Sequence, residues 1–232
     1  MCGRFGASFH YRDIKATWNL YGDFDGFFPR YNIAPSQDVP VIVCNEKRNE
    51  LRPMRWGLMP SWAQDPSIGQ RMINARSETL LEKPSFKELV STRRCLVPAD
   101  GFYEWQKDGN RRVPMWFYLK NRKPFAFPGL WDCWLDRDTG NALYTFTIIT
   151  TRANGLVQRF HNRMPVIYDA AMGRQWLERP FGGRRMELDL VLQPPPPERM
   201  EAHEVSTRLI RLRTTRQRAF SVFPKGTQET HS

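Results

Sequence analysis

The chain has 232 residues, of which 41% are hydrophobic and eight are tryptophan, so it can build one substantial core and we expect a single domain over residues 1–232. Its apolar runs fall well short of the roughly 20 residues that a membrane span requires, and the first residues lack the basic and then apolar pattern of a signal peptide. We therefore expect a soluble cytoplasmic protein with no membrane partner. The net charge of +11 favours a polyanionic partner such as nucleic acid.

Short runs rich in β-branched and aromatic residues dominate the middle of the chain, and helical patterns are few. Gly, Pro, Asn and Asp separate these runs, and "KDGN" (107–110) is typical of a hairpin turn. In chain order we predict a helix at 12–20, a strand at 39–44, a helix at 84–91, strands at 94–99, 113–120 and 142–150, and a helix at 169–178 capped by Asp169. This spacing predicts an α+β fold with a barrel-like, mostly antiparallel β core and short peripheral helices.

The end of the chain has a different composition. "LQPPPPER" (192–199) is typical of a stiff, extended linker, so we expect the residues after it to pack loosely or to run along the surface. "STRLIRLRTTRQR" (206–218) carries five arginines and no acid. It is either a basic arm for a phosphate backbone or a solvated tail, and the lack of an aromatic platform favours the tail.

The four cysteines are Cys2, Cys44, Cys95 and Cys133, and no two of them form a C-x-x-C pair. Because metal sites usually show close ligand spacing, we expect no metal and no cofactor. The last three lie in strand-like runs and are typical of buried thiols in a reducing compartment. Cys2, in the opening "MCGRF", has no such setting.

Four stretches carry side chains that a protein does not need merely to fold: "MCGRF", "RMINARSET" (71–79), "PADGFYEW" (98–105) and "RFHNRMPVI" (159–167). Each stretch also has an ordinary interpretation. Glu104, for example, could simply point outward from a strand, and His161 could be a capped histidine in a loop. Together they supply a thiol, an amide, a carboxylate and an imidazole, which is a nucleophile with acid–base partners. The candidate residues are Cys2, Asn74, Glu104 and His161.

The position of Cys2 has a chemical explanation if Met1 is removed. The residue then offers an α-amine with an ordinary pKa of about 7.7–8.0 and a thiol with one of about 8.5. An aldehyde forms an imine with the amine, and the thiol then closes a five-membered thiazolidine ring. An internal cysteine cannot react in this way, because its nitrogen belongs to a peptide bond.

Several blocks of the chain resemble one known family. They are "MCGRF", "RYNIAPSQ" (30–37), "WGLMPSW" (56–62), "INARSET" (73–79), "PADGFYEW" and "TTRANGLVQRFHNRMPVI" (150–167). Their order and spacing, from residue 1 to about 178, are similar to those of the SOS response-associated peptidase family, whose members process abasic sites in DNA. The resemblance implies one α+β domain with a barrel-like core and a basic cleft for single-stranded DNA.

The same resemblance implies an activity. An exposed amino-terminal cysteine forms a thiazolidine with the ring-opened sugar of an abasic site, after the protein has removed its own Met1. Some members also show β-lyase cleavage of the strand or slow reversal of the crosslink. Carried over by position, Cys2 is the nucleophile, Asn74 holds its amine and thiol, Glu104 relays protons, and His161 protonates the sugar oxygen.

The resemblance also implies residues that bind DNA. Arg4, Arg76 and Arg163 match phosphate-binding positions, where guanidinium groups suit phosphate geometry. Trp62 and Trp105 match positions that stack on bases.

The chain matches the family pattern at two further positions and departs from it at two places. Asn32 and Pro35 match the family pattern and are expected to shape the floor of the site. Asn162 stands where family members commonly have Asp, although His161 is kept. The segment 192–232 diverges from the family, which leaves its packing and any strand it contributes undecided.

The leading hypothesis is therefore a monomer that crosslinks to abasic sites in single-stranded DNA and associates with the nucleoid during DNA damage. Two alternatives come from other classes of protein. An amino-terminal-nucleophile amide hydrolase also unmasks Cys2, but it needs an oxyanion hole, to which nothing in the sequence points. A non-covalent single-strand binder uses the same basic and aromatic residues without needing the thiol.

Overall fold

The computed structural model describes residues 2–109 and 111–207. Most of the Arg-rich segment 206–218 lies outside these ranges, so the choice between a phosphate-binding arm and a solvated tail stays a prediction. No helix in the described ranges is both long enough and apolar enough to cross a membrane.

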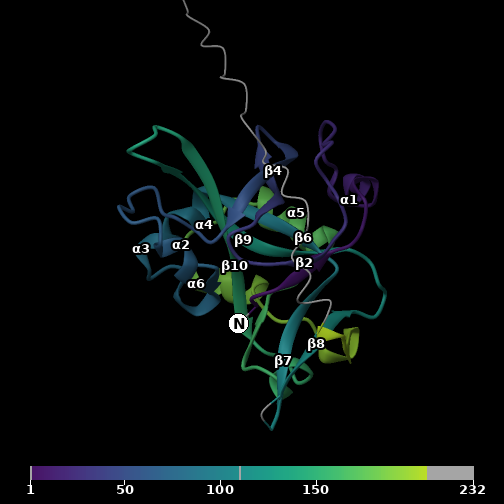
Figure 1. Cartoon of the computed structure of the whole chain (residues 1–232). Coiled ribbons are helices and arrows are strands. Elements are labelled where there is room, and N and C mark those ends of the chain that lie inside the picture. Colours follow the sequence, from purple (N-terminus) through teal and green to yellow (C-terminus); the bar gives the residue numbers. More distant parts are fainter. Residues whose placement is uncertain (1, 110, 208–232) are drawn as a thin grey trace, which may run out of the picture.

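Within the described residues, five strands form a closed barrel (Figure 1). They are β3 (Asp38–Asn45), β4 (Arg48–Trp56), β6 (Arg94–Ala99), β9 (Phe125–Leu135) and β10 (Ala142–Arg152). Hydrogen bonding follows the order β10-β4-β3-β6-β9, and β9 then pairs with β10, which closes the ring. Only the β4–β10 pairing among these strands is parallel. The predicted barrel-like, mostly antiparallel core is confirmed.

A second sheet packs against the barrel and carries the first strand of the chain. Its order is β12-β8-β7-β1-β2. The strands are β1 (Phe5–Ala7), β2 (Arg30–Ile33), β7 (Gly101–Asp108), β8 (Arg111–Leu119) and β12 (Met200–Glu204). β7 and β8 form the hairpin at the lower end of Figure 1, and Asp108 pairs with Arg111 across the turn that was predicted at 107–110.

Aromatic rings fill the space between the barrel and the second sheet. Phe5 of β1 packs edge-on against Trp56 and Phe127, with ring centroids 5.1 and 5.7 Å apart. Phe102 of β7 lies 6.4 Å from Phe127. All four side chains are fully buried, and burial of a side chain of this size stabilises the fold by roughly 1.5–3 kcal/mol. This packing fixes β1, and with it the residues just before it, against the barrel.

Two glycines allow an indole ring to cover the pairing of β1 with β7. Gly6 pairs with Gly101, and the Trp116 side chain of β8 lies directly over both. An added Cβ at Gly101 would lie 2.1 Å from this ring, and one at Gly6 would lie 2.7 Å from it. Larger residues at these positions would therefore displace Trp116 or separate the strands.

Short helices surround the barrel. They are α1 (Tyr11–Trp18), α2 (Ile68–Arg71), α3 (Pro84–Lys87), α4 (Leu89–Thr92), α5 (Ala170–Glu178) and α6 (Arg185–Val191). The predicted cap is confirmed, because the Asp169 carboxylate accepts hydrogen bonds from the N–H groups of Ala171 and Met172 at 3.1 and 3.0 Å. The prediction of one helix at 84–91 is wrong in one respect. The segment is helical, but it is divided at Glu88 into two helices, α3 and α4.

The residues after the Pro-rich segment run along the surface, which was one of the two predicted alternatives, but they do so as an edge strand of the second sheet. Residues 193–196 form neither helix nor strand, Pro197–Arg199 form a 3₁₀ turn, η3, and β12 then pairs with β8 from Met200 to Glu204. The buried Met200 anchors this strand, which supplies hydrogen-bond partners to β8. Cys95 is buried as expected. Cys44 and Cys133 are only half-buried. Cys44 lies near the end of β3, and the Cys133 side chain points to the opposite face of its strand from the buried Asp132 and Trp134.

Candidate active site

The site lies where β10 extends beyond the barrel. Past its pairing with β9, β10 pairs in parallel with β5 (Asn74–Arg76) and antiparallel with β11 (Arg163–Pro165). Ile148 is level with Asn74, and Arg152 is level with Arg163. The stretches that contain β5 and β11, about 90 residues apart in the sequence, are therefore both paired with β10.

The second sheet brings the start of the chain to the same place. The Tyr103 N–H donates to the Arg4 carbonyl oxygen at 2.9 Å, one residue beyond the paired Phe5 and Phe102. If the antiparallel register of β1 and β7 is continued toward the amino terminus, Gly3 lies opposite Glu104 and Cys2 lies opposite Trp105. The Asn74 side-chain N–H₂ donates to the Cys2 carbonyl oxygen at 2.9 Å. Residues of β5, β7 and the amino-terminal segment therefore meet at Cys2.

Asn74 contacts the main chain of Cys2 and not its thiol. The Asn74 Oδ1 atom is buried and has no hydrogen-bond partner among the described residues. An unpaired buried acceptor of this kind costs free energy.

The Cys2 side chain is fully buried, with 0% of its surface exposed. The exposed cysteine that the family resemblance implied is therefore not what the encoded chain shows. Its Sγ points into the hydrophobic core and lies 3.9 Å from the Arg4 carbonyl oxygen. Burial raises the pKa of the Cys2 thiol, and the Glu104 carboxylate raises it further. In this state the thiol is covered and protonated, and its nitrogen is still joined to Met1.

Glu104 of β7 is buried, with 5% of its surface exposed. Burial raises the pKa of Glu104 from 4.5 to about 7. A carboxyl group with this pKa exchanges protons near neutral pH, which suits a general acid or base. The sequence-based interpretation of Glu104 as a strand glutamate that points outward is therefore wrong.

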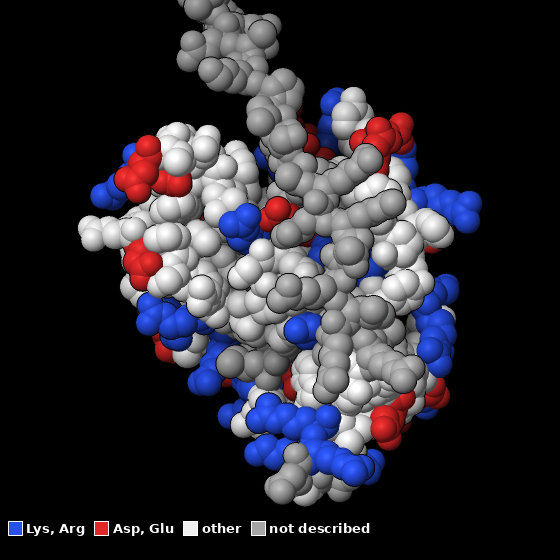
Figure 2. All heavy atoms as spheres, in the orientation of Figure 1, with Lys and Arg blue, Asp and Glu red and all other residues white. Residues whose placement is uncertain are grey.

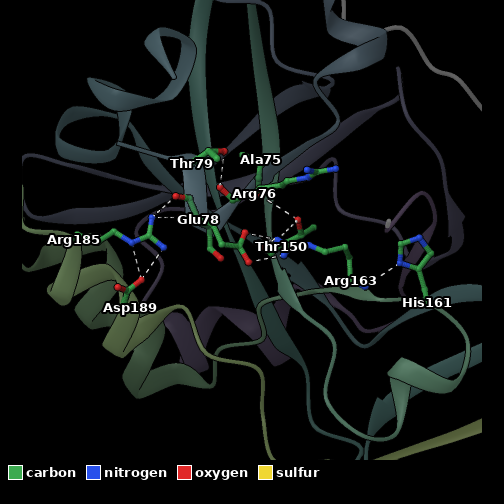
Figure 3. Close-up of polar contacts among 10 residues, drawn as sticks. Ala75, Arg76, Glu78, Thr79, Thr150, His161, Arg163, Arg185 and Asp189 are labelled. Atoms are coloured by element: carbon green, nitrogen blue, oxygen red, sulfur yellow. Dashed lines mark hydrogen bonds and ion pairs between the residues drawn. The ribbon is translucent and has the colours of Figure 1, made fainter. Parts of the chain in front are cut away.

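His161 lies between the 3₁₀ turn η2 (Val157–Arg159) and β11, two residues before the strand begins. Its Nδ1 accepts the Arg163 main-chain N–H at 2.9 Å (Figure 3). Because Nδ1 is an acceptor, the neutral ring carries its hydrogen on Nε2. Burial lowers the pKa of His161. The imidazole is therefore held neutral, with Nε2–H as its donor.

Cys2 and Glu104 influence each other's surroundings. The negative charge of the Glu104 carboxylate acts to raise the pKa of the Cys2 thiol, which requires that the two side chains lie close together.

Arg163 has a partner that the sequence did not reveal. Its guanidinium forms a bidentate ion pair with Glu78 of the 3₁₀ turn η1 (Ser77–Thr79), at 2.5 and 2.9 Å, and also donates to the Thr150 carbonyl at 2.6 Å (Figure 3). Only 12% of the Arg163 side chain is exposed. These contacts argue against its prediction as a free phosphate ligand and instead show it fixing the loop that carries His161.

The turn that carries Glu78 is itself held in place. Arg185 of α6 donates to the carbonyl oxygens of Ser77 and Glu78 at 2.9 and 2.6 Å, and it pairs with Asp189 (Figure 3). The ion pair with Arg163 lowers the pKa of Glu78, although burial alone would raise it. Glu78 therefore stays charged around neutral pH.

The other predicted DNA-binding residues occupy different settings. Trp62 is 57% exposed, whereas Trp105 is half-buried. Arg76 is exposed, and its side chain extends away from the Glu78–Arg163 pair (Figure 3). Arg4 donates to the Oδ1 of the buried Asn32 at 2.7 Å. Asn32 therefore supports Arg4 from the side, and Pro35, two residues beyond β2, is half-buried.

Replacing Glu78 by alanine should lower the free energy of unfolding by about 1–2 kcal/mol, because it removes two charge-assisted hydrogen bonds from a mostly buried arginine. Urea denaturation measures this change. Glu50→Ala is a suitable control, since the Glu50–Arg52 pair, at 3.2 Å, is more open to solvent and should matter less. Equal losses in the two variants would show that Glu78 has no special role in the site.

Glu78 and Thr150 are the residues of this site that sequence reasoning missed as partners of Arg163. Glu78 lies in the "RMINARSET" stretch, but nothing in a single sequence links it to an arginine 85 residues later.

The fold and the site together define a β-barrel protein in which the buried Cys2 lies beside Asn74 and Glu104. The chain belongs to the SOS response associated peptidase (SRAP) family, whose model matches residues 1–211. The resemblance seen in the sequence is thereby confirmed.

Relatives and solved structures agree with this assignment. The abasic site processing protein YoqW of Bacillus subtilis (strain 168) is 43% identical over 210 residues, which cover 89% of this chain and 93% of that protein. The abasic site processing protein HMCES of Xenopus tropicalis is 32% identical over 250 residues, which cover 89% of this chain and 74% of that protein. A crystal structure of a protein from Bacteroides thetaiotaomicron matches with a TM-score of 0.81 and 29% identity, covering 88% of this chain and 92% of that one.

Proposed function

We propose that the protein processes abasic sites in single-stranded DNA by joining Cys2 covalently to the open-chain sugar. The observation that carries this proposal is the hydrogen bond from Asn74 to the Cys2 carbonyl, beside Glu104, whose charge acts on the Cys2 thiol. The names of the relatives, abasic site processing proteins, support the same substrate.

The reaction joins one aldehyde and one terminal cysteine with loss of water. After Met1 has been removed, the Cys2 amine bonds to C1′ of the open sugar, and the aldehyde oxygen leaves as water, which produces an imine. The Cys2 sulfur then bonds to the imine carbon, and the thiol proton passes to the nitrogen. Glu104, with its pKa near 7, is suited to accept the amine proton, and the Nε2–H of His161 is suited to assist the departing oxygen.

Surface chemistry supports binding of the strand. Trp62 offers an exposed ring, and stacking of one base on such a ring is worth about 1–3 kcal/mol. Figure 2 shows Lys and Arg gathered at the end of the β7–β8 hairpin, where Lys107, Arg111 and Arg112 are exposed. Cations of this kind contribute sequence-independent attraction to phosphates.

The finer parts of the proposal follow from the same cluster. We propose that the protein removes Met1 itself, with Glu104 as the base that activates water. The imine is also the intermediate from which β-elimination would cleave the strand, so lyase activity belongs to the proposal. We expect the protein to act as a monomer in the cytoplasm, on DNA that carries damage.

An adduct assay tests the proposal. The protein is mixed with a single-stranded oligonucleotide that holds one abasic site, and the products are separated on a denaturing gel after heating. We expect one protein–DNA band, and no such band with the same strand carrying an intact base. Binding without a band that survives heating would instead identify a non-covalent single-strand binder.

A further inference from the structure

The loop that carries Trp62 has a small hydrophobic cluster of its own. We call residues 59–63 the Trp62 loop; they follow shortly after the end of β4. Met59 and Ala63 of this loop pack with Trp134 of β9 in a cluster that is separate from the main core. The loop is therefore packed on β9, although the Trp62 ring itself is 57% exposed.

Strand register brings two polar side chains to this loop. Asp132 of β9 pairs with Thr145 of β10. Cross-strand partners project from the same face of a sheet, so the two side chains lie side by side. The Thr145 hydroxyl accepts the Met59 N–H at 2.8 Å. The Asp132 carboxylate accepts the Ser61 N–H at 2.8 Å. One face of the β9–β10 pair therefore supplies acceptors to alternate residues of the Trp62 loop.

A third contact lies on the other side of Trp62. The Trp134 indole N–H donates to the Ala63 carbonyl oxygen at 2.8 Å. Trp134 is two residues beyond Asp132 on β9, so both side chains leave the same face of the strand. Ser61 and Ala63, the residues on either side of Trp62, are thus both tied to β9. The main chain at Trp62 is fixed, while its ring stays open to solvent.

Asp132 is a charged group in a buried position, with only 4% of its side chain exposed. A buried carboxylate is costly unless its charge and its lone pairs have partners. The Arg93 guanidinium forms an ion pair with Oδ1, and the Cys133 N–H donates to the same atom at 2.8 Å. Oδ2 is the atom that accepts from Ser61. Arg93 and Cys133 therefore hold the carboxylate in the orientation that anchors the Trp62 loop.

We propose that Asp132 is a positioning residue for the bound single strand, and that it acts through Trp62. Asp132 is buried and does not touch the strand, but it fixes the main chain beside the ring that stacks on a base. Stacking on a ring that is already positioned costs less conformational entropy than stacking on one that must first be ordered. The inference rests on the proposed function, because base stacking by Trp62 belongs to it.

A double-mutant cycle with Trp62→Ala tests this role. The experiment uses the full chain and an intact single strand, which cannot form an adduct, and fluorescence anisotropy gives Kd. Trp62→Ala should weaken binding roughly tenfold, as expected for the loss of one stacked base. Asp132→Ala should weaken binding roughly fivefold when Trp62 is present. When Trp62 is already alanine, the same change should weaken binding by less than about twofold.

A merely structural role of Asp132 would not depend on Trp62 in this way. Equal weakening by Asp132→Ala in the two backgrounds would refute the proposal, and so would an unchanged Kd. An unchanged Kd in Trp62→Ala would refute it as well, because no stacking ring would then need positioning. The adduct assay is read separately, so an adduct formed without any contribution from Trp62 would reject this inference and leave the proposed function intact.

Asn49→Ala is the matched control. Asn49 is also a buried polar residue whose side chain holds a main-chain group, since it donates to the Trp18 carbonyl oxygen at 3.0 Å. It lies at the start of β4, whereas the Trp62 loop follows the end of that strand. Asn49→Ala should lower Tm as Asp132→Ala does, but it should leave Kd within about twofold. If it weakens binding as much as Asp132→Ala, lost stability explains both effects and the proposal is refuted.

Thr145→Val provides the same test if Asp132→Ala does not fold. Valine is close to threonine in size but lacks the hydroxyl, so only the acceptor for the Met59 N–H is lost. This variant should weaken binding roughly threefold when Trp62 is present. The effect should disappear when Trp62 is alanine. An effect of the same size in both backgrounds would refute the proposal.

Discussion

Replacing Cys2 by alanine should abolish the heat-stable adduct with abasic DNA, reducing it at least 100-fold. The alanine amine still forms an imine, but without a thiol the imine cannot close to a thiazolidine and hydrolyses. Binding to the strand should remain, because the cationic surface is unchanged. Denaturing gels measure the first effect, and anisotropy measures the second.

Cys133→Ala provides the control for this variant. Cys133 is a half-buried thiol on β9, outside the cluster, and its loss should leave the adduct at full yield. An adduct that survives in Cys2→Ala, or disappears equally in Cys133→Ala, would exclude Cys2 as the linking residue.

The burial of Cys2 imposes a further condition. In the encoded chain the thiol is fully covered and burial raises its pKa, so iodoacetamide should label it slowly while Met1 is attached. Removal of Met1 must expose it. Intact mass spectrometry distinguishes the two forms and the label that each carries. If Cys2 of the processed chain resists alkylation under native conditions while Cys44 and Cys133 react, the thiol is inaccessible to a sugar and the proposal fails.

Four strands of the two sheets were predictable because they have clear local signals. β3, β6, β8 and β10 lie in runs rich in β-branched and aromatic residues, and each was predicted to within about two residues. β4 was missed because "RNELRPMRW" contains three arginines and a proline, and its identity as a strand comes from pairing with β3 along eight residues. Local propensity cannot report such tertiary pairing.

Candidate residues for the site could be named from the sequence, but their arrangement could not be predicted. The residue types and the family resemblance predict roles for Asn74, Glu104 and His161, and these roles stay predictions. Burial of Cys2 could not be predicted, because it follows from packing of the amino-terminal segment against the barrel. The engagement of Arg163 by Glu78 depends on the pairing of both β5 and β11 with β10. That arrangement exists only in three dimensions.

Replacing Glu104 by glutamine should slow adduct formation by about 100-fold or more, because the amide has nearly the same shape but cannot exchange a proton. In the unaltered protein the ionised carboxylate is the base, and burial raises the pKa of Glu104 to about 7. The rate should therefore rise roughly tenfold per pH unit below 7 and level off above 8. This dependence should be absent in Glu104→Gln. Glu88→Gln, an exposed change of equal charge, should behave as the unaltered protein.

Stability gives an independent measurement of the same pKa. Because the folded protein raises the pKa of Glu104 from 4.5 to about 7, the folded state holds the proton more tightly than the unfolded state does. The stabilisation from this proton is complete below pH 4.5 and is lost as the pH rises to 7. Glu104→Gln should therefore have a higher Tm than the unaltered protein at pH 8, and the difference should shrink at pH 5. Glu104→Gln could react more slowly and yet differ from the unaltered protein by the same Tm at pH 8 and at pH 5. That result would mean that Glu104 is not the buried group that titrates near 7.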